Sequence, residues 1–200
     1  GTKVFAKVAG QADDFPFAVI TKMKNSTRAG ITTKENGKDR PHLSLGGATN
    51  SKQRVAAAVG GNEGSYVDVQ AYDNAVLTHG MSQWTQQSGN LFKLLWRYKV
   101  SQAQLFAQYF EDRDVEVHGT EKSPEVWVEG TQLVEQSETS LHLAYCLWQS
   151  GYETAFQEIQ LESLTDRIKR FYPSSYAGPN LYFTSEQSIA HLLDLNVNRP

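Results

Sequence analysis

The chain has 200 residues, 40% of them hydrophobic and 11% aromatic, which is enough to bury the core of one domain. Its formal net charge of −3 argues against a nucleic-acid-binding protein, because such proteins carry a basic surface. The single cysteine, Cys146, excludes an internal disulfide, and no run approaches the roughly 20 apolar residues that a membrane span needs. We therefore expect a single domain over residues 1–200, with no membrane span and no nucleic-acid partner.

Residues 1–50 have the least regular pattern. Residues 4–8 and 15–20 each suit a short strand, and Asn36-Gly37 favours a tight hairpin turn because both residues tolerate positive φ. We expect an irregular N-terminal segment with one hairpin, packed on a core formed by residues 51–200.

A helix is predicted over residues 52–59. Ser51 is a suitable N-cap, and the alanines that follow let another element approach closely. Gly60 and Gly61 are predicted to end this helix, as glycine does at helix C-termini. Glu63 is therefore expected just beyond the helix end, on a turn.

The rest of the chain is mainly helical by its apolar spacing. Leu91, Leu94, Leu95 and Tyr98 recur at helical intervals, and Ser101 with Gln104 has the form of a capping box for a second helix. Residues 115–118 and 126–128 alternate like strands. Further helices are expected over residues 140–149, from Gly151 to a stop at Pro173, and after Thr184. The expected fold class is α+β and mostly helical.

Residues 60–85 form the stretch in which catalysis is expected. A carboxylic acid donates a proton near neutral pH only if its pKa is raised, and burial against apolar groups does this. Glu63 near a helix end suits that role, with a second carboxylate kept ionised in a more polar setting, as in glycoside hydrolysis. Asp73 is the better second carboxylate, because it leads into the strand-like run 75–77, and Asp68 is the reserve.

The order of these residues resembles the lysozyme superfamily, which includes goose-type lysozymes, lytic transglycosylases and chitosanases. The similarity lies in Glu63 after a helix, followed by a short β segment that ends in Gly80-Met81-Ser82-Gln83. The run 73–80 is also similar to the chitosanase pattern, where an aspartate five residues before a threonine carries the second role. The resemblance covers residues 51–85 and implies a lysozyme-like fold with a small β element at the cleft.

The resemblance also implies roles. Glu63 would be the general acid and Asp73 the general base, on a β-1,4-linked amino-sugar polymer: bacterial peptidoglycan first, a chitosan-type polymer second. Such an enzyme, of bacterial or phage type, would be secreted, periplasmic or delivered to the cell wall. The residues assigned to substrate binding are Tyr72, Thr78, His79, Gly80, Gln83 and Trp84.

Two other interpretations stay open. Glu63 and Asp73 also suit ordinary turn residues, Gln83 suits a bond to the backbone, and Tyr72 and Trp84 suit core packing. Alternatively, the chain is a non-catalytic module of lysozyme fold that binds glycan or a protein partner within a larger cell-wall or secretion assembly.

No metal or cofactor is expected. The five histidines are scattered, and none forms a His-x-x-x-His ligand pair. Asp112, Asp114 and Glu116 form an acidic cluster without the spacing of a calcium loop. A nucleophile elbow and a phosphate loop are both absent. Cys146 stands in an apolar helical context, so it is expected in the core.

Overall fold

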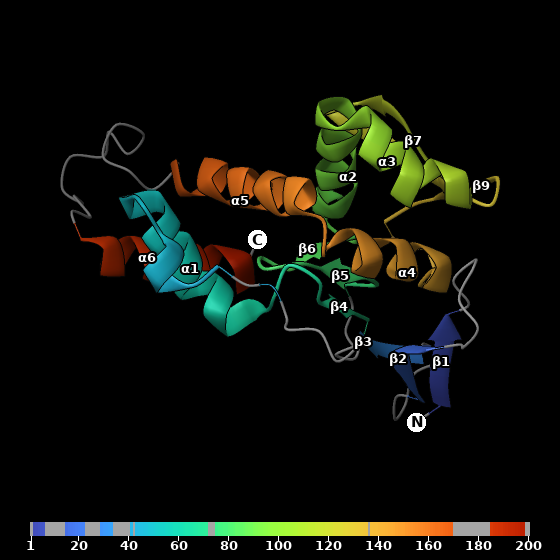
Figure 1. Ribbon diagram of the computed structural model, residues 1–200, viewed down its shortest axis with the longest axis horizontal. Helices are drawn as coiled ribbons and strands as arrows, with labels where there is room; N and C mark the ends of the chain where they lie inside the picture. Colours follow the sequence, from blue (N-terminus) through green and yellow to red (C-terminus); the bar gives the residue numbers. More distant parts are fainter. Residues whose placement is uncertain are drawn as a thin grey trace.

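The computed structural model describes residues 2–6, 15–22, 29–33, 41, 43–71, 75–135, 137–169 and 185–198. This part of the chain contains six α-helices and two antiparallel sheets, which confirms the α+β class (Figure 1). The helices are α1 (Ser51–Glu63), α2 (Asn90–Ser101), α3 (Ala103–Tyr109), α4 (Leu141–Ser150), α5 (Thr154–Ile168) and α6 (Glu186–Asn198). None of these described helices combines the length and apolar character needed to cross a bilayer.

The first sheet has six strands whose spatial order is their order in the chain. They are β1 (Thr2–Ala6), β2 (Phe15–Lys22), β3 (Ala29–Thr33), β4 (Val69–Gln70), β5 (Thr78–His79) and β6 (Trp84–Thr85). The two predicted N-terminal strands are present and a third follows them, so residues 2–6, 15–22 and 29–33 are more regular than expected. Residues 43–50 are irregular apart from a short 3-10 turn at Leu45–Gly47. The third strand pairs with β2 along its length, and the pair Thr32 and Gln70 then joins it to β4, a long-range contact that the short local pattern does not encode. The predicted Asn36-Gly37 turn lies outside the described residues.

The second sheet is a three-stranded meander of β7 (Val115–Thr120), β8 (Ser123–Val128) and β9 (Thr131–Leu133). Val115 and Val117 on β7 and Val126 and Val128 on β8 are buried, so the predicted alternation is confirmed. The ninth strand was not predicted, because Thr131–Leu133 is too short to show a period.

The apolar core surrounds α2, which contacts α3, α5, β6, β7 and β8. Tyr98 on α2 stacks on Phe156 of α5, with ring centroids 4.3 Å apart, and meets Phe106 and Phe110 edge-on. Aromatic pairs of this kind contribute about 0.5–1.5 kcal/mol each beyond the area they bury. Cys146 of α4 lies in the same core, as expected.

Helix α1 is longer than predicted. Asn50 rather than Ser51 is its N-cap, with the Asn50 side chain accepting a hydrogen bond of 3.0 Å from the Gln53 amide. Gly60 and Gly61 lie inside the helix, which ends at Glu63. The expected stop at the glycines is therefore wrong. A Cβ on Gly60 would come within 2.8 Å of the Met81 methyl carbon, so this glycine serves close packing.

Two other helix boundaries were predicted from side-chain caps. Ser140 does cap α4, because its hydroxyl accepts a hydrogen bond of 3.1 Å from the Leu143 amide. The capping box at Ser101 and Gln104 is absent: Ser101 is the last residue of α2, and α3 begins after Gln102 without a side-chain cap. The predicted stop at Pro173 and the start at Thr184 lie outside the described residues.

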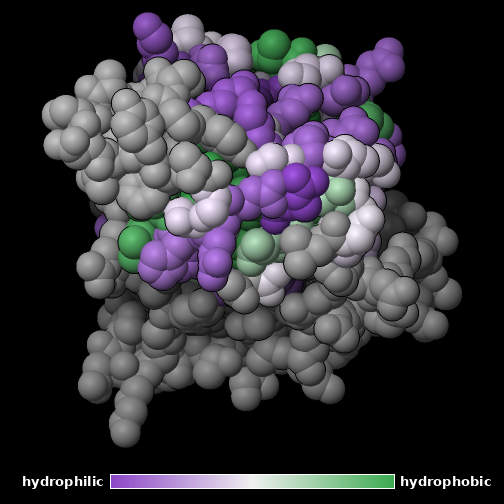
Figure 2. All heavy atoms as spheres, turned by 90° about the vertical axis from the view of Figure 1, so that its left-hand side faces the viewer, coloured by the Kyte–Doolittle hydropathy of each residue, from purple (hydrophilic) through white to green (hydrophobic). Residues whose placement is uncertain are grey.

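Figure 2 views the molecule from the left-hand side of Figure 1, where α1, α5 and α6 lie. The coloured residues on this face are mostly hydrophilic, with apolar residues as separate spots. A pocket of about 540 Å³ lies between α1 and α6, lined by Ala58, Val59, Gln187, Ser188, Ala190, His191 and Asp194.

Candidate functional site

Glu63 stands at the junction of α1 and the small sheet β4–β6. It is the last residue of α1 and is partly exposed. Carbonyl groups at a helix C-terminus have no partner within the helix. The side-chain amide of Gln83 supplies one, donating a hydrogen bond of 2.7 Å to the Glu63 carbonyl oxygen. The bond ties the helix end to the turn between β5 and β6, and it agrees with the alternative interpretation that Gln83 binds backbone.

That turn, residues 80–83, depends on Gly80. Its φ of +79° lies in the left-handed region, and a Cβ there would stand 2.3 Å from Gln160 Oε1 and 3.0 Å from Trp84 Cζ3. Gln83 also has positive φ, at 45°, which aims its side chain back toward α1. Gly80 thus permits the close approach of α5, and its assignment to substrate binding stays a prediction.

Asp68 is the carboxylate nearest Glu63 along the described chain. It is 9% exposed, and its Oδ2 accepts a hydrogen bond of 2.7 Å from the Ser65 amide. Its carbonyl oxygen also accepts from the Gly80 amide at 2.8 Å. The first bond closes the turn that leads from α1 into β4, and the second joins that turn to the turn 80–83. Asp68 therefore shapes the backbone after Glu63.

His79 lies inside the protein. It is 1% exposed and stacks on Phe156, with ring centroids 5.5 Å apart and planes 10° from parallel. Its Nδ1 is 3.1 Å from the Asp68 carbonyl oxygen, and its Nε2 is 3.3 Å from Gln160 Nε2. Burial lowers the pKa of His79 to about 3, although the bond to the Asp68 carbonyl acts in the opposite direction. The ring is therefore neutral over the physiological range.

Thr78 and Trp84, two other residues assigned to the substrate, are also buried. Thr78 is 5% exposed and donates from Oγ1 to the Gln70 carbonyl oxygen at 3.2 Å, and Trp84 is 4% exposed. With His79, they form the interior of the sheet, with Gly80 buried in the adjoining turn, and these residues do not wall a cleft in this structure. The predicted strand 75–77 is also displaced, because Val76 has a φ of 68° and β5 begins at Thr78.

Tyr72 and Asp73 lie outside the described residues. They are the predicted second carboxylate and one of the predicted substrate contacts. Of the predicted site, the described residues that meet fall into two groups. Glu63 and Gln83 meet at the helix end, and Thr78, His79 and Trp84 lie in the sheet next to Gly80 of its turn.

Sequence reasoning missed Gln160, a polar residue of α5 that lies against β5 and the turn 80–83. Gln160 is 0% exposed and bonds to Tyr66, His79 and Met81. The sequence did hold a signal that Gln160 is buried, because it is four residues from both Phe156 and Leu164 on the apolar face of its helix. Arg167 of α5 adds a second link, donating to the hydroxyl of Ser82 at 3.3 Å.

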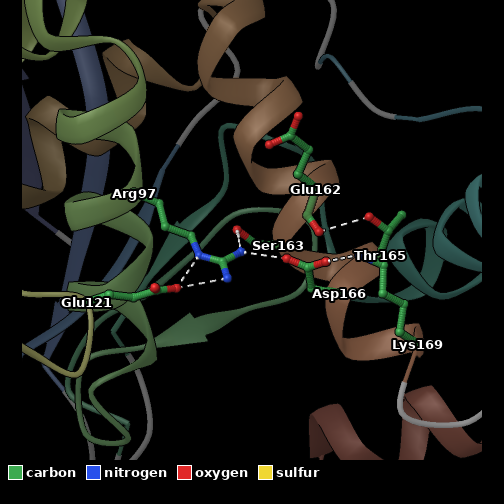
Figure 3. Close-up of polar contacts among 7 residues, drawn as sticks. All are labelled: Arg97, Glu121, Glu162, Ser163, Thr165, Asp166 and Lys169. Carbon is green, nitrogen blue, oxygen red and sulfur yellow. Dashed lines mark hydrogen bonds and ion pairs between the residues drawn. The ribbon is translucent and has the colours of Figure 1, made fainter. Parts of the chain in front are cut away.

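A separate polar cluster joins α2, α5 and the turn between β7 and β8 (Figure 3). Arg97 points between Glu121 and Asp166, with guanidinium nitrogens 3.0 Å from an oxygen of each. Its Nη1 also lies 3.3 Å from the Ser163 hydroxyl, and Lys169 pairs with Asp166 at 2.6 Å. The charged side chains of Arg97, Glu121, Asp166 and Lys169 each have an opposite partner, so the arrangement holds elements together.

The described residues contain no group of three or more potential metal ligands. Near the acidic cluster, a pocket of about 380 Å³ is lined by Asp114, Glu116, His118, Glu125, Trp127 and Gly130. Within it, His118 Nε2 is 2.8 Å from Glu116 Oε2. Burial raises the pKa of the Cys146 thiol to about 12, so this cysteine is not a nucleophile at neutral pH.

Comparison with protein-family models, with curated proteins and with solved structures finds no match for this chain.

Proposed function

We propose that this protein cleaves a β-1,4-linked amino-sugar polymer, with peptidoglycan as the first candidate and a chitosan-type polymer as the second. The observation that carries the proposal is the place of Glu63. It is the last residue of α1, it is partly exposed, and its carbonyl is bonded to Gln83 of the turn that closes the sheet β4–β6. This agrees with the order of helix, glutamate and small β element on which the resemblance to lysozyme-like enzymes rests.

In the proposed reaction, Glu63 protonates the glycosidic oxygen of the leaving sugar. Proton transfer by a positioned side chain contributes roughly 10²- to 10⁴-fold to the rate. The second carboxylate in the proposal is Asp73, which directs water or stabilises the positive charge that develops on the sugar ring. Asp68 is the weaker candidate, because its Oδ2 bonds to the Ser65 amide in a buried turn.

The distance between the two carboxylates would decide the stereochemistry. A gap of roughly 5–5.5 Å accompanies retention, and roughly 6.5–9.5 Å accompanies inversion. The polymer would meet the partly exposed end of α1, since Thr78, His79 and Trp84 are buried. The same burial favours the second candidate, a module of this fold that binds glycan or protein without cleaving it, because those residues then serve packing alone.

The test compares the wild-type chain with Glu63→Gln on purified peptidoglycan and on chitosan. We expect soluble oligosaccharides from one of these polymers with the wild type, and a loss of about 10²-fold or more with Glu63→Gln. The masses of the products separate hydrolysis from formation of an anhydro sugar, which differs by one water.

Glu158→Gln is the matched control, because Glu158 is an exposed glutamate on α5. It is expected to keep wild-type activity. Cleavage by Glu63→Gln at the wild-type rate would remove Glu63 from the mechanism. Wild-type protein that binds the insoluble polymer and releases nothing would instead support the non-catalytic module.

A further inference from the structure

The buried amide of Gln160 contacts three segments that are distant from it in the chain. Its Nε2 donates to the Tyr66 carbonyl oxygen at 3.0 Å and lies 3.3 Å from His79 Nε2. Its Oε1 is 3.4 Å from the Met81 amide nitrogen. A buried amide without partners costs roughly 1–3 kcal/mol, so a glutamine at this interior position needs all of these contacts.

Only one placement of hydrogens lets the Gln160 amide and the His79 ring bond to all their neighbours. The Tyr66 carbonyl can only accept, and the Met81 amide can only donate, so the Gln160 amide has a single acceptable orientation. The carbonyl of Asp68 also can only accept, so His79 carries its proton on Nδ1. His79 Nε2 then carries no proton, and its lone pair accepts a hydrogen bond from the second N–H of the Gln160 amide.

The contacts continue from Gln160 to Glu63. Gln160 holds the turn at Met81, and Gly80 permits this approach because any Cβ would stand 2.3 Å from Gln160 Oε1. Two residues further on, Gln83 donates to the Glu63 carbonyl at 2.7 Å. The position of the α1 end relative to the sheet is therefore coupled to a side chain from α5.

We propose that Gln160 is a positioning residue: it holds the turn 80–83, and through Gln83 it sets the place of Glu63. The effect of Gln160 on the catalytic rate rests on the proposed function, whereas its effect on the position of residues 80–83 does not. Displacements of about 1 Å at a reacting group cost up to about 10²-fold in rate, so a side chain that never meets the substrate still affects kcat.

The experiment replaces Gln160 by Met, which has similar length but neither of the amide's groups, and by Glu, which keeps an acceptor and loses the amide donors. Gln157→Met is the matched control, because Gln157 lies on the same helix and bonds to Gly151 instead of to the turn. Two measurements are made on each: nitrogen NMR of the His79 ring and the Gln83 side-chain amide, and kcat and KM on the cleaved polymer.

With Gln160→Met, we expect the His79 Nε2 resonance to shift because this nitrogen loses its donor, while the Asp68 carbonyl keeps the proton on Nδ1. We also expect the Gln83 amide resonances to shift. We expect kcat to fall about ten- to 100-fold while KM stays within about twofold. With Gln160→Glu, a carboxylate beside Nε2 favours the protonated ring, and His79 should titrate about 1–3 pH units higher than in the wild type. Gln157→Met should change none of these.

The outcomes separate this inference from the proposed function. A folded Gln160→Met protein with unshifted His79 Nε2 and Gln83 resonances and wild-type kcat would show that Gln160 only fills the core. Wild-type protein without cleavage of any polymer would overturn the proposed function, and the NMR result would still decide the positioning role. If Gln160→Met does not fold, the His79 titration in Gln160→Glu decides it: an unchanged titration overturns the inference.

Discussion

Gln83 bonds to Glu63 across 20 positions of sequence, its Nε2 lying 2.7 Å from the Glu63 carbonyl oxygen. The contact joins the C-terminal end of α1 to the turn between β5 and β6. Met81 and Ser82 of the same turn also form hydrogen bonds with α5. A change at any of these points is therefore expected to move the helix end.

Replacing Gln83 by Ala removes this bond and leaves the Glu63 carbonyl to water. Ala and Gln are strained alike at a φ of 45°, so the difference in stability between the two proteins reports the loss of the side-chain hydrogen bond. We expect the free energy of unfolding to fall by about 1 kcal/mol, measured by urea denaturation. Gln87→Ala, at an exposed glutamine four residues later, is the control and should change stability by less than about 0.5 kcal/mol. Equal losses in the two variants would contradict a role for the bond.

Replacing Gly80 by Ala is expected to be severe. The new Cβ would lie 2.3 Å from Gln160 Oε1, at a φ of +79° that a side chain rarely adopts. We expect a loss of roughly 2 kcal/mol or more and a lower midpoint of thermal unfolding. Gly61→Ala is the opposite control, because nothing lies within 4 Å of its Cβ position inside α1, and it should gain about 0.5–1 kcal/mol. A neutral Gly80→Ala would show that α5 does not press on the turn.

The buried His79 predicts sensitivity to mild acid. Its pKa is about 3 in the folded protein and 6.5 in the unfolded chain, so below pH 6.5 only the unfolded chain takes up this proton. The stability that depends on a neutral His79 is therefore fully present above pH 6.5 and is lost progressively as the pH falls toward 3. The loss is about 1.4 kcal/mol per pH unit, measured by denaturation between about pH 6 and 4.

Two variants isolate this effect. His79→Gln removes the titrating ring and should flatten the dependence of stability on pH. His191→Gln, at an exposed histidine of α6, should leave the dependence as it is in the wild type. If His79→Gln and the wild type lose stability in parallel, His79 is not the group that titrates.

The ion pairs of Arg97 are expected to contribute modestly. Burial disfavours the ionised form of Asp166, but hydrogen bonds from Lys169 and Arg97 outweigh it, and its pKa is lowered. Because the side chains of Arg97 and Asp166 are 34% and 43% exposed, solvent screens the pair. A double-mutant cycle with Arg97→Ala and Asp166→Ala should give a coupling of about 0.5–1 kcal/mol at pH 7.

This coupling has two further signatures. It should shrink at about 1 M salt, where the screening length is short. Since the folded pKa of Asp166 is lowered, its share of the stability is present above the ordinary carboxyl range and is lost as the pH falls below it. A coupling unaffected by salt would point to packing of the Arg97 side chain instead of charge.

Local pattern predicted much of this fold. Apolar spacing located α2, α4 and α5, and alternation located β7 and β8, because each buries one face of a regular element. The same reasoning placed Glu63 beside a helix end. It misplaced that end by reading Gly60 as a stop, since the partner that makes a small residue useful there, Met81, lies 21 positions away.

Sequence by itself determined the α+β class, the register of the amphipathic elements and the choice of Glu63 as the first residue to mutate, because those depend on neighbours within one or two turns. Tertiary structure alone decided that Thr78, His79 and Trp84 are interior. Gln160 reaches His79 from 81 positions later in the chain, and burial depends on which distant element covers a residue. The stretch around Glu63 is thus a partly exposed helix end held by a buried polar network that only the folded chain assembles.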